Sequence, residues 1–324
     1  MIRKFLPLLL LTIALVSSYS LAAQNLAQGI RLYESKQFDR ATNVLEQVKK
    51  GESAYAESRY YLALIAFNAK DHSKAEDHLK QAIATNDKVS KYHYAMANLL
   101  GVIAQNSNMI RQASLASRIK SHLESAVALD PKAMEPASRL VGFYMVAPKI
   151  MGGDIDKAKQ LAANMLKIDA AEGHRITGFI ADREKNYAEA ERHFKLAVQS
   201  GPDSLKYYEA LGSFYNGQKR HADAMKVYEN AFTRFQDKNN LLLQAGRMGA
   251  QAGNVHFSKA TDYLNRYLQA LPNRQDRSAA NAHYYLGLIQ KQSLNNTLAK
   301  NHFQEALKIN PEHKASQDAI KNMN

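Results

Sequence analysis

The sequence predicts an all-α protein built as a stack of helical hairpins. Three observations support this: a pattern of small and bulky residues recurs, neighbouring copies lie 34 residues apart, and each copy has a helical period. The clearest copies run Gly178, Ala190, Phe194, Ala197 and Pro202, then Gly212, Ala224, Tyr228 and Ala231, and later Gly287, Ala299, Phe303, Ala306 and Pro311. A fixed period in this range indicates a stack of similar supersecondary units, an α-solenoid.

Each unit is expected to contain two antiparallel helices, A and B. On helix A of the clearest copy, a spacing of i, i+3, i+4 and i+7 places on one side His174, Thr177, Gly178 and Ala181. On helix B, a spacing of i, i+4, i+7 and i+8 selects Ala190, Phe194, Ala197 and Val198, and Pro202 follows as a helix stop. Because Gly178 and Ala190 are small, the two backbones can approach, and Phe194 fills the space beside them.

Looser copies of the pattern fill residues 24–311, which gives about eight units. Two segments break the period: residues 110–116 are expected to enlarge the turn of the third unit, and residues 146–153 that of the fourth. In the second segment, Gly152 and Gly153 either form an anion-binding nest or permit a tight turn in which Asp154 caps helix B. Residues 312–324 are expected to form a polar capping helix with Ala315, Ala319 and Ile320 on its apolar side.

The first 23 residues have the features of an export signal. Arg3 and Lys4 precede an apolar run over residues 5–16, and small residues follow up to Ala23. We expect this segment to be cleaved, which predicts a periplasmic or secreted protein. The alternative is a membrane anchor formed by residues 5–23, because about 20 apolar residues span a bilayer.

The residue types disfavour an enzyme and predict no cofactor and no metal site. The chain has no cysteine, which excludes thiolate metal sites, a cysteine nucleophile and disulfides. No two of the eleven histidines have the i, i+4 spacing of helical metal ligands, and no phosphate-binding glycine loop occurs. Four histidines share one register of helix B and are expected to pack or to face solvent: His78, His122, His193 and His302.

Nucleic-acid binding is not expected, although the chain is basic. The tyrosines occur mainly as adjacent pairs, namely Tyr60 with Tyr61, Tyr207 with Tyr208, and Tyr284 with Tyr285. Neighbouring positions on a helix point in different directions, so each pair is expected to divide between the core and the outer face. Such pairs do not build the stacking ladder that holds single strands.

The small and bulky pattern resembles the tetratricopeptide repeat family, whose 34-residue unit has a Trp-Leu-Gly-Tyr helix and an Ala-Phe-Ala-Pro helix. The resemblance covers residues 24–311 and departs at the family's Trp, which is replaced by His174, Tyr208 and His283. It implies a right-handed superhelix whose concave wall is lined mainly by helix A. The segment Ala147, Pro148, Gly152 and Gly153 is also similar to a loop of exported bacterial members.

A groove for a peptide is therefore expected on the helix A positions that the repeat pattern leaves free. The candidate residues are Tyr33, Tyr60, Leu64, Phe67, Asn98, Gln105, Arg175, Phe179, Asp182 and Arg183. Apolar side chains would anchor a peptide and amides would bind its backbone. The alternative is that Leu64 and Phe67 only pack against the adjacent hairpin. The lysines with which chaperone-tail binders of this family hold a terminal carboxylate are absent, so a carboxylate clamp is not expected.

The sequence thus predicts a non-enzymatic, exported scaffold that binds a peptide segment or partner protein in envelope assembly, secretion or transport. A membrane contact is expected only if the N-terminal segment is retained. The alternative is a module that binds a small or polymeric anionic ligand, because basic residues outnumber acidic residues by 43 to 30. In that case Arg175 and Arg183 would take part.

Overall fold

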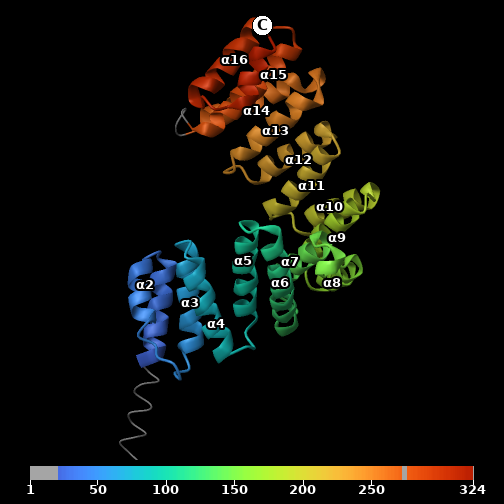
Figure 1. Ribbon diagram of the computed structural model, residues 1–324. Coiled ribbons are helices and arrows are strands. Elements are labelled where there is room, and N and C mark those ends of the chain that lie inside the picture. Colours follow the sequence, from blue (N-terminus) through green and yellow to red (C-terminus); the bar gives the residue numbers. More distant parts are fainter. Residues whose placement is uncertain (1–20, 272–275, 324) are drawn as a thin grey trace, which may run out of the picture. The chain divides into compact units, whose positions relative to one another are not determined.

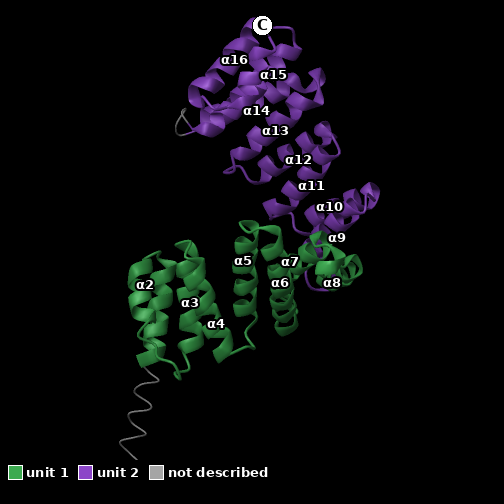
Figure 2. Cartoon of the chain, viewed as in Figure 1, with its two compact units in different colours: residues 1–165 green, residues 166–324 purple. Residues whose placement is uncertain are grey.

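The computed structural model describes residues 21–271 and 276–323, and every regular element in these ranges is a helix (Figure 1). The predicted signal segment, residues 1–23, lies almost entirely outside the described residues. The chain divides into two compact units, residues 1–165 and 166–324 (Figure 2). Among the described residues, no helix combines the length and the apolar character needed to cross a lipid bilayer.

The first unit begins with a helix that includes residues 21–34. Its further helices are α2 (Phe38–Leu45), α3 (Tyr55–Asn68), α4 (His72–Thr85), α5 (Ser90–Gln105), α6 (Met109–Leu129), α7 (Met134–Val146), the short η1 (Lys149–Met151) and α8 (Ile155–Ile168), whose last turn belongs to the second unit.

The second unit continues with α9 (Ala170–Arg183), α10 (Tyr187–Ser200), α11 (Leu205–Gly217), α12 (His221–Arg234), α13 (Asn240–Ala252), η2 (Asn254–His256), α14 (Phe257–Ala270), α15 (Arg277–Gln292), α16 (Asn296–Ile309) and α17 (Lys314–Lys321).

Consecutive helices pack in pairs, which confirms the predicted hairpins. Such pairs are α3 with α4, α5 with α6, α9 with α10, α11 with α12, α13 with α14, and α15 with α16. The second helix of a pair also contacts the first helix of the next, as α4 contacts α5 and α10 contacts α11. Each hairpin therefore hides its apolar stripe on its neighbours, as in a solenoid.

Within a hairpin, the glycine of helix A lies against the bulky residue of helix B. A Cβ atom added to Gly178 would stand 2.9 Å from the ring of Phe194, and one added to Gly212 would stand 2.6 Å from that of Tyr228. The alanine one turn before the bulky residue, Ala190 or Ala224, is fully buried. The predicted roles of the small and bulky residues are thus confirmed.

The turn between the two helices has a recurrent backbone conformation. Lys36, Lys70, Lys185, Lys219 and Leu294 all have φ between 58° and 62°. In this left-handed conformation, the second residue after helix A ends the helix and its N–H bonds back to the last turn, as Lys70 N–H does to Phe67 O. Four of the five positions are lysines, whose long side chains reach into water while the backbone turns.

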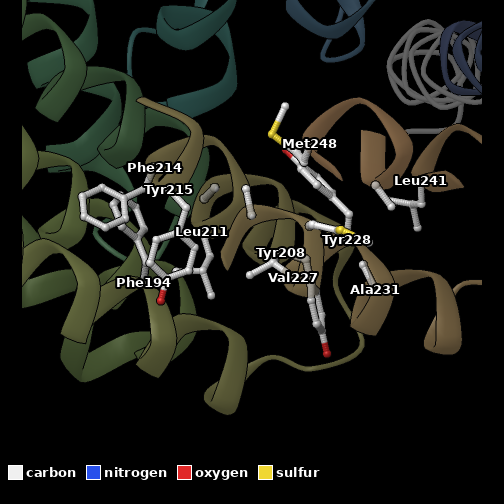
Figure 3. Close-up of a cluster of buried hydrophobic side chains, with 14 of the residues drawn as sticks. Phe194, Tyr208, Leu211, Phe214, Tyr215, Val227, Tyr228, Ala231, Leu241 and Met248 are labelled. Carbon is white, nitrogen blue, oxygen red and sulfur yellow. The ribbon is translucent and has the colours of Figure 1, made fainter. Parts of the chain in front are cut away.

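The core of the second unit is aromatic and aliphatic (Figure 3). Phe194 of α10 and Phe214 of α11 join successive hairpins, with ring centroids 5.3 Å apart. Burial of a Phe side chain contributes about 1.5–3 kcal/mol to stability. The expected division of the tyrosine pairs between core and outer face is wrong: Tyr207 and Tyr208 are both buried, and both members of each of the other two pairs are partly buried. Tyr207 packs on the preceding hairpin and Tyr208 in the central cluster, since α11 has neighbours on both sides.

Three further segments refine the prediction. Residues 110–116 do not enlarge a turn: they form the first turns of α6, where Asn108 accepts a hydrogen bond from Arg111 N–H. Residues 147–154 do form a connecting loop, in which Asp154 caps α8 by accepting from the N–H groups of Asp156 and Lys157. In α17, Ala319 and Ile320 are partly buried as expected, but Ala315 is exposed and Ser316 is the buried residue of the first turn.

The two glycines of the connecting loop are needed for its shape. Gly152 has a φ of 92°, which side chains rarely adopt, and a Cβ on Gly153 would overlap the carbonyl oxygen of Ala147. Together with the cap at Asp154, this geometry favours the tight turn over the anion-binding nest.

Candidate functional site

A small cavity of about 220 Å³ lies in the first unit between α3, α4 and α5. Its walls are mainly apolar. The lining residues are Tyr60, Ala63, Leu64, Phe67, Ala75, Leu79, Lys91, Tyr94, Ala95, Asn98 and Leu99.

Helical periodicity explains why these side chains meet. On α3, Tyr60, Leu64 and Phe67 lie at i, i+4 and i+7 and so share one face. On α5, Lys91 and Asn98 are seven residues apart, two turns along the facing side. Helix α4 closes the floor with small and aliphatic side chains, because it packs behind both.

Asn98 holds an unused hydrogen-bond acceptor in this apolar wall. Its Oδ1 atom is buried, and no hydrogen-bond donor among the described residues reaches it. A buried carbonyl without a partner costs about 1–3 kcal/mol, and natural structures rarely keep one without a reason.

The charge at the rim of the cavity, that of Lys91, is neutralised by a neighbouring carboxylate. The ammonium group of Lys91 pairs with Glu57 and lies 5.0 Å from the centre of the Tyr60 ring. Burial, with smaller effects of Tyr61 and Glu57, raises the pKa of Tyr60 to about 12. The Tyr60 hydroxyl therefore stays protonated at neutral pH and can donate a hydrogen bond.

The structure brings four of the predicted groove residues together at this cavity: Tyr60, Leu64, Phe67 and Asn98. Tyr33 lies outside the lining and connects to it through rings, since Tyr33 contacts Tyr61 and Tyr61 contacts Tyr60. Gln105, at the end of α5, is exposed and does not line the cavity.

Two lining residues with polar groups were missing from the site predicted from the sequence. Lys91 and Tyr94 come from the first turns of α5, three residues apart. They share a helical face with Asn98, so the spacing i, i+3 and i+7 could have identified them.

The remaining four predicted residues lie on α9 in the second unit, and three of them are engaged there. Both guanidinium donors of Arg175 bind the carboxylate of Glu172, which also pairs with Lys206. The Phe179 ring packs edge-on against Phe194, with centroids 5.0 Å apart.

The other two predicted residues differ in their surroundings. Asp182 accepts a hydrogen bond from Gln218, and burial raises the pKa of its carboxyl group. Arg183, the next residue on α9, is exposed to solvent.

A larger hollow of about 610 Å³ lies in the second unit over α12, α13 and α14. Its charged side chains pair with one another: Lys259 and the Tyr263 hydroxyl bind Glu229. Arg266 lies over the Phe232 and Tyr263 rings. Unlike the cavity beside Asn98, this hollow has no buried side-chain acceptor without a partner among its lining residues.

The side chains of the types that bind metal ions do not cluster into a metal centre in the part of the chain that the structure describes. In the ranges that the structure describes, no three His, Asp or Glu residues lie in an arrangement that could hold a metal ion.

Two segments of the chain match family models described as tetratricopeptide repeat, residues 32–99 and residues 180–239. The first match contains the cavity beside Asn98. A comparison with curated proteins gave no match.

Solved structures show the same fold at low sequence identity. A tetratricopeptide repeat protein from Parabacteroides merdae is 13% identical, with a TM-score of 0.55, over 95% of this chain and 99% of that one. Yeast Tom70 is 17% identical, with a TM-score of 0.59, over 93% of this chain. The chain spans 63% of the Tom70 structure. The repeated hairpins, their glycine-to-aromatic contacts, the two family matches and the solved structures agree: the chain has the tetratricopeptide repeat fold, and residues 32–99 and 180–239 match this family.

Proposed function

We propose that this protein is a binding scaffold that holds a peptide segment of a partner protein at the cavity between α3 and α5. A tetratricopeptide repeat fold is that of a protein-binding or peptide-binding scaffold, and members of the family are generally not enzymes. The observation that carries the proposal is the buried Oδ1 of Asn98, which has no partner among the described residues and lies in a mainly apolar wall.

The chemistry of the cavity defines the peptide. A volume of about 220 Å³ accepts one apolar side chain, which would lie against Leu64 and Phe67. A backbone N–H of the same peptide would donate to Asn98 Oδ1. Because Lys91 is already paired with Glu57, the site does not select for an acidic residue.

Peptides selected from a random library on residues 24–324 would test this. Two variants, Phe67→Ala and Asn98→Leu, are expected to weaken the selected peptides at least tenfold, while Tyr187→Ala, an exposed aromatic on α10, leaves affinity unchanged. Asn98→Leu removes a buried acceptor, so it is expected to keep or raise stability while binding is lost. Peptides that bind both groove variants normally would rule out this site.

The ionic-strength dependence separates this proposal from binding of an anionic ligand. Apolar anchoring and a neutral hydrogen bond predict an affinity that changes little between about 0.05 and 0.5 M salt. An affinity that collapses over this range would favour the anionic ligand instead.

We also propose that the scaffold acts in the cell envelope, after export, in assembly, secretion or transport. The support is the sequence of residues 1–23, with its basic start, apolar run and small residues. Fractionation of cells that express the tagged protein, with mass spectrometry of its N-terminus, tests this. A full-length N-terminus in the cytosolic fraction would contradict it.

A further inference from the structure

Three hairpins contain the same contact between two imidazole rings, one on each helix. The Nδ1 atoms of His93 and His122 are 3.1 Å apart between α5 and α6. The corresponding distance is 2.9 Å between His174 and His193 of α9 and α10, and 3.4 Å between His283 and His302 of α15 and α16. The three contacts are called the histidine pairs below.

The pairs recur because of their register in the repeat. Each second histidine stands directly before the bulky core residue of its helix, which is Leu123, Phe194 or Phe303, and these three are almost completely buried. His174 and His283 stand four residues before the glycine that faces that core residue. The core therefore fixes both rings, so the two Nδ1 atoms must face each other.

Only one hydrogen fits between the two Nδ1 atoms of a pair. In the first pair, the Nε2 of His93 is 2.8 Å from the carbonyl oxygen of Asp87. A carbonyl oxygen only accepts, so this Nε2 carries the hydrogen and the Nδ1 of the neutral ring accepts. The donor must then be the Nδ1–H of His122. The neutral pair is thus a hydrogen bond that ties helix A to helix B.

Few charged groups lie close enough to the histidine pairs to shift the pKa values of their rings. In the first pair, Arg118 lies one turn before His122 and contributes, after burial and His93, to lowering the pKa of the His122 ring. On the second pair, Arg192 lies 3.0 Å from the Nε2 of His193, and the carboxylate of Glu189 lies at the same distance from that atom. The third pair faces Glu305, which is bound by Lys308.

We propose that the histidine pairs are proton-operated clasps that hold three hairpins closed at neutral pH and release them in mild acid. One extra proton leaves the Nδ1–H to Nδ1 hydrogen bond intact. A second proton places a hydrogen on both Nδ1 atoms of two cationic rings at 2.9–3.4 Å, so the bond is lost and the rings repel. The helices α5 and α6, α9 and α10, and α15 and α16 then separate more easily.

The direction of the pKa shifts agrees with this. Burial, followed by the neighbouring His93, lowers the pKa of His122 to about 4. Burial also lowers the pKa of the imidazoles of both other pairs, His174, His193, His283 and His302. In the unfolded chain a histidine titrates near pH 6.5. Because the folded pKa is lower, the stabilisation is complete above about pH 6.5 and is lost as the pH falls toward the folded pKa.

Hydrogen exchange of the whole chain tests the proposal hairpin by hairpin. The hairpin of α13 and α14 is an internal control, because Leu242 and Tyr263 occupy the two registers of the pair and neither helix contains a histidine. Between about pH 7.5 and pH 5, after correction for intrinsic exchange rates, protection is expected to fall at least tenfold more in the paired hairpins than in α13 and α14. An equal change in all hairpins would overturn the proposal.

Side-chain measurements give a second, independent test. Nuclear magnetic resonance of the imidazole nitrogens at pH 7.5 is expected to show one Nδ1–H in each pair and coupled titration of the two rings. The variants His122→Asn, His193→Asn and His302→Asn keep a polar group near the Nδ1 position at every pH and are expected to remove the extra acid sensitivity of their own hairpin. His72→Asn and His256→Asn, where no second imidazole is in contact, are the controls. Six independent titrations near pH 6.5 would refute the clasps.

Discussion

A methyl group added to Gly287 would stand 2.5 Å from Cε1 of Phe303, which is closer than real Cβ contacts allow. The two residues face each other across the hairpin of α15 and α16, and Phe303 is fully buried. The same relationship holds for Gly178 with Phe194 and for Gly212 with Tyr228. The repeat therefore depends on the absence of a side chain on helix A as much as on the aromatic ring on helix B.

Gly287→Ala is expected to destabilise the second unit by about 1–3 kcal/mol, because the fully buried ring must move to make room. Gly142→Ala is the matched control, since that helical glycine in α7 has no atom within 4 Å of the added Cβ. There, alanine is expected to stabilise by about 0.5–1 kcal/mol through its better helix propensity. Urea unfolding of both variants measures the difference, and a neutral Gly287→Ala would contradict the packing.

Ala224→Leu is expected to cost about 1–3 kcal/mol. Ala224 is fully buried where α12 meets α11, so three more carbon atoms have no space. Thermal melting detects the loss, with Ala188→Leu, at an exposed position of α10, as the control. An unchanged melting temperature would show that Ala224 is not at the helix contact.

Glu172→Gln is expected to destabilise the second unit by about 1–2 kcal/mol. Glu172 is only 4% exposed and its carboxylate binds Arg175 and Lys206, so the substitution leaves two cations near a neutral amide. Asp237→Asn removes an exposed ion pair with Lys238 and is expected to change stability by less than about 1 kcal/mol. Equal effects of the two substitutions in urea unfolding would show that the pair on α9 has no special role.

His78→Leu is expected to reduce the acid sensitivity of the first unit. Both ring nitrogens of His78 are buried without a hydrogen-bond partner among the described residues. Burial, and then Arg59 and Lys74, lowers the pKa of this ring. The wild type therefore loses stability as the pH falls below about 6.5, where the unfolded chain binds the proton, and the leucine variant does not.

Urea unfolding at about pH 7.5 and pH 5 measures this, with His72→Leu in the first turn of the same helix as the control. The gain from His78→Leu should be larger at pH 5 than at pH 7.5. A gain that is the same at both values would mean that His78 is not kept neutral by the fold.

The sequence by itself determined the hairpin, its period and the residues at its centre. Gly178, Ala190 and Phe194 could be assigned because local periodicity and residue volume dictate which side chains meet within one hairpin. The same reasoning placed Tyr60, Leu64 and Phe67 on one face of α3. These contacts follow from positions less than one repeat apart, where helix geometry alone fixes direction.

Only the tertiary structure decided what lies opposite each of these faces. His193 and His302 were expected to pack or to face solvent, and the sequence did not show that His174 and His283 meet them. Likewise, the unpartnered acceptor of Asn98 and the pairing of Lys206 with Glu172 depend on the fit of adjacent helices and hairpins. Contacts across a turn or between hairpins depend on how the helices rotate and cross, and that is fixed by the packing of the whole core rather than by a local pattern.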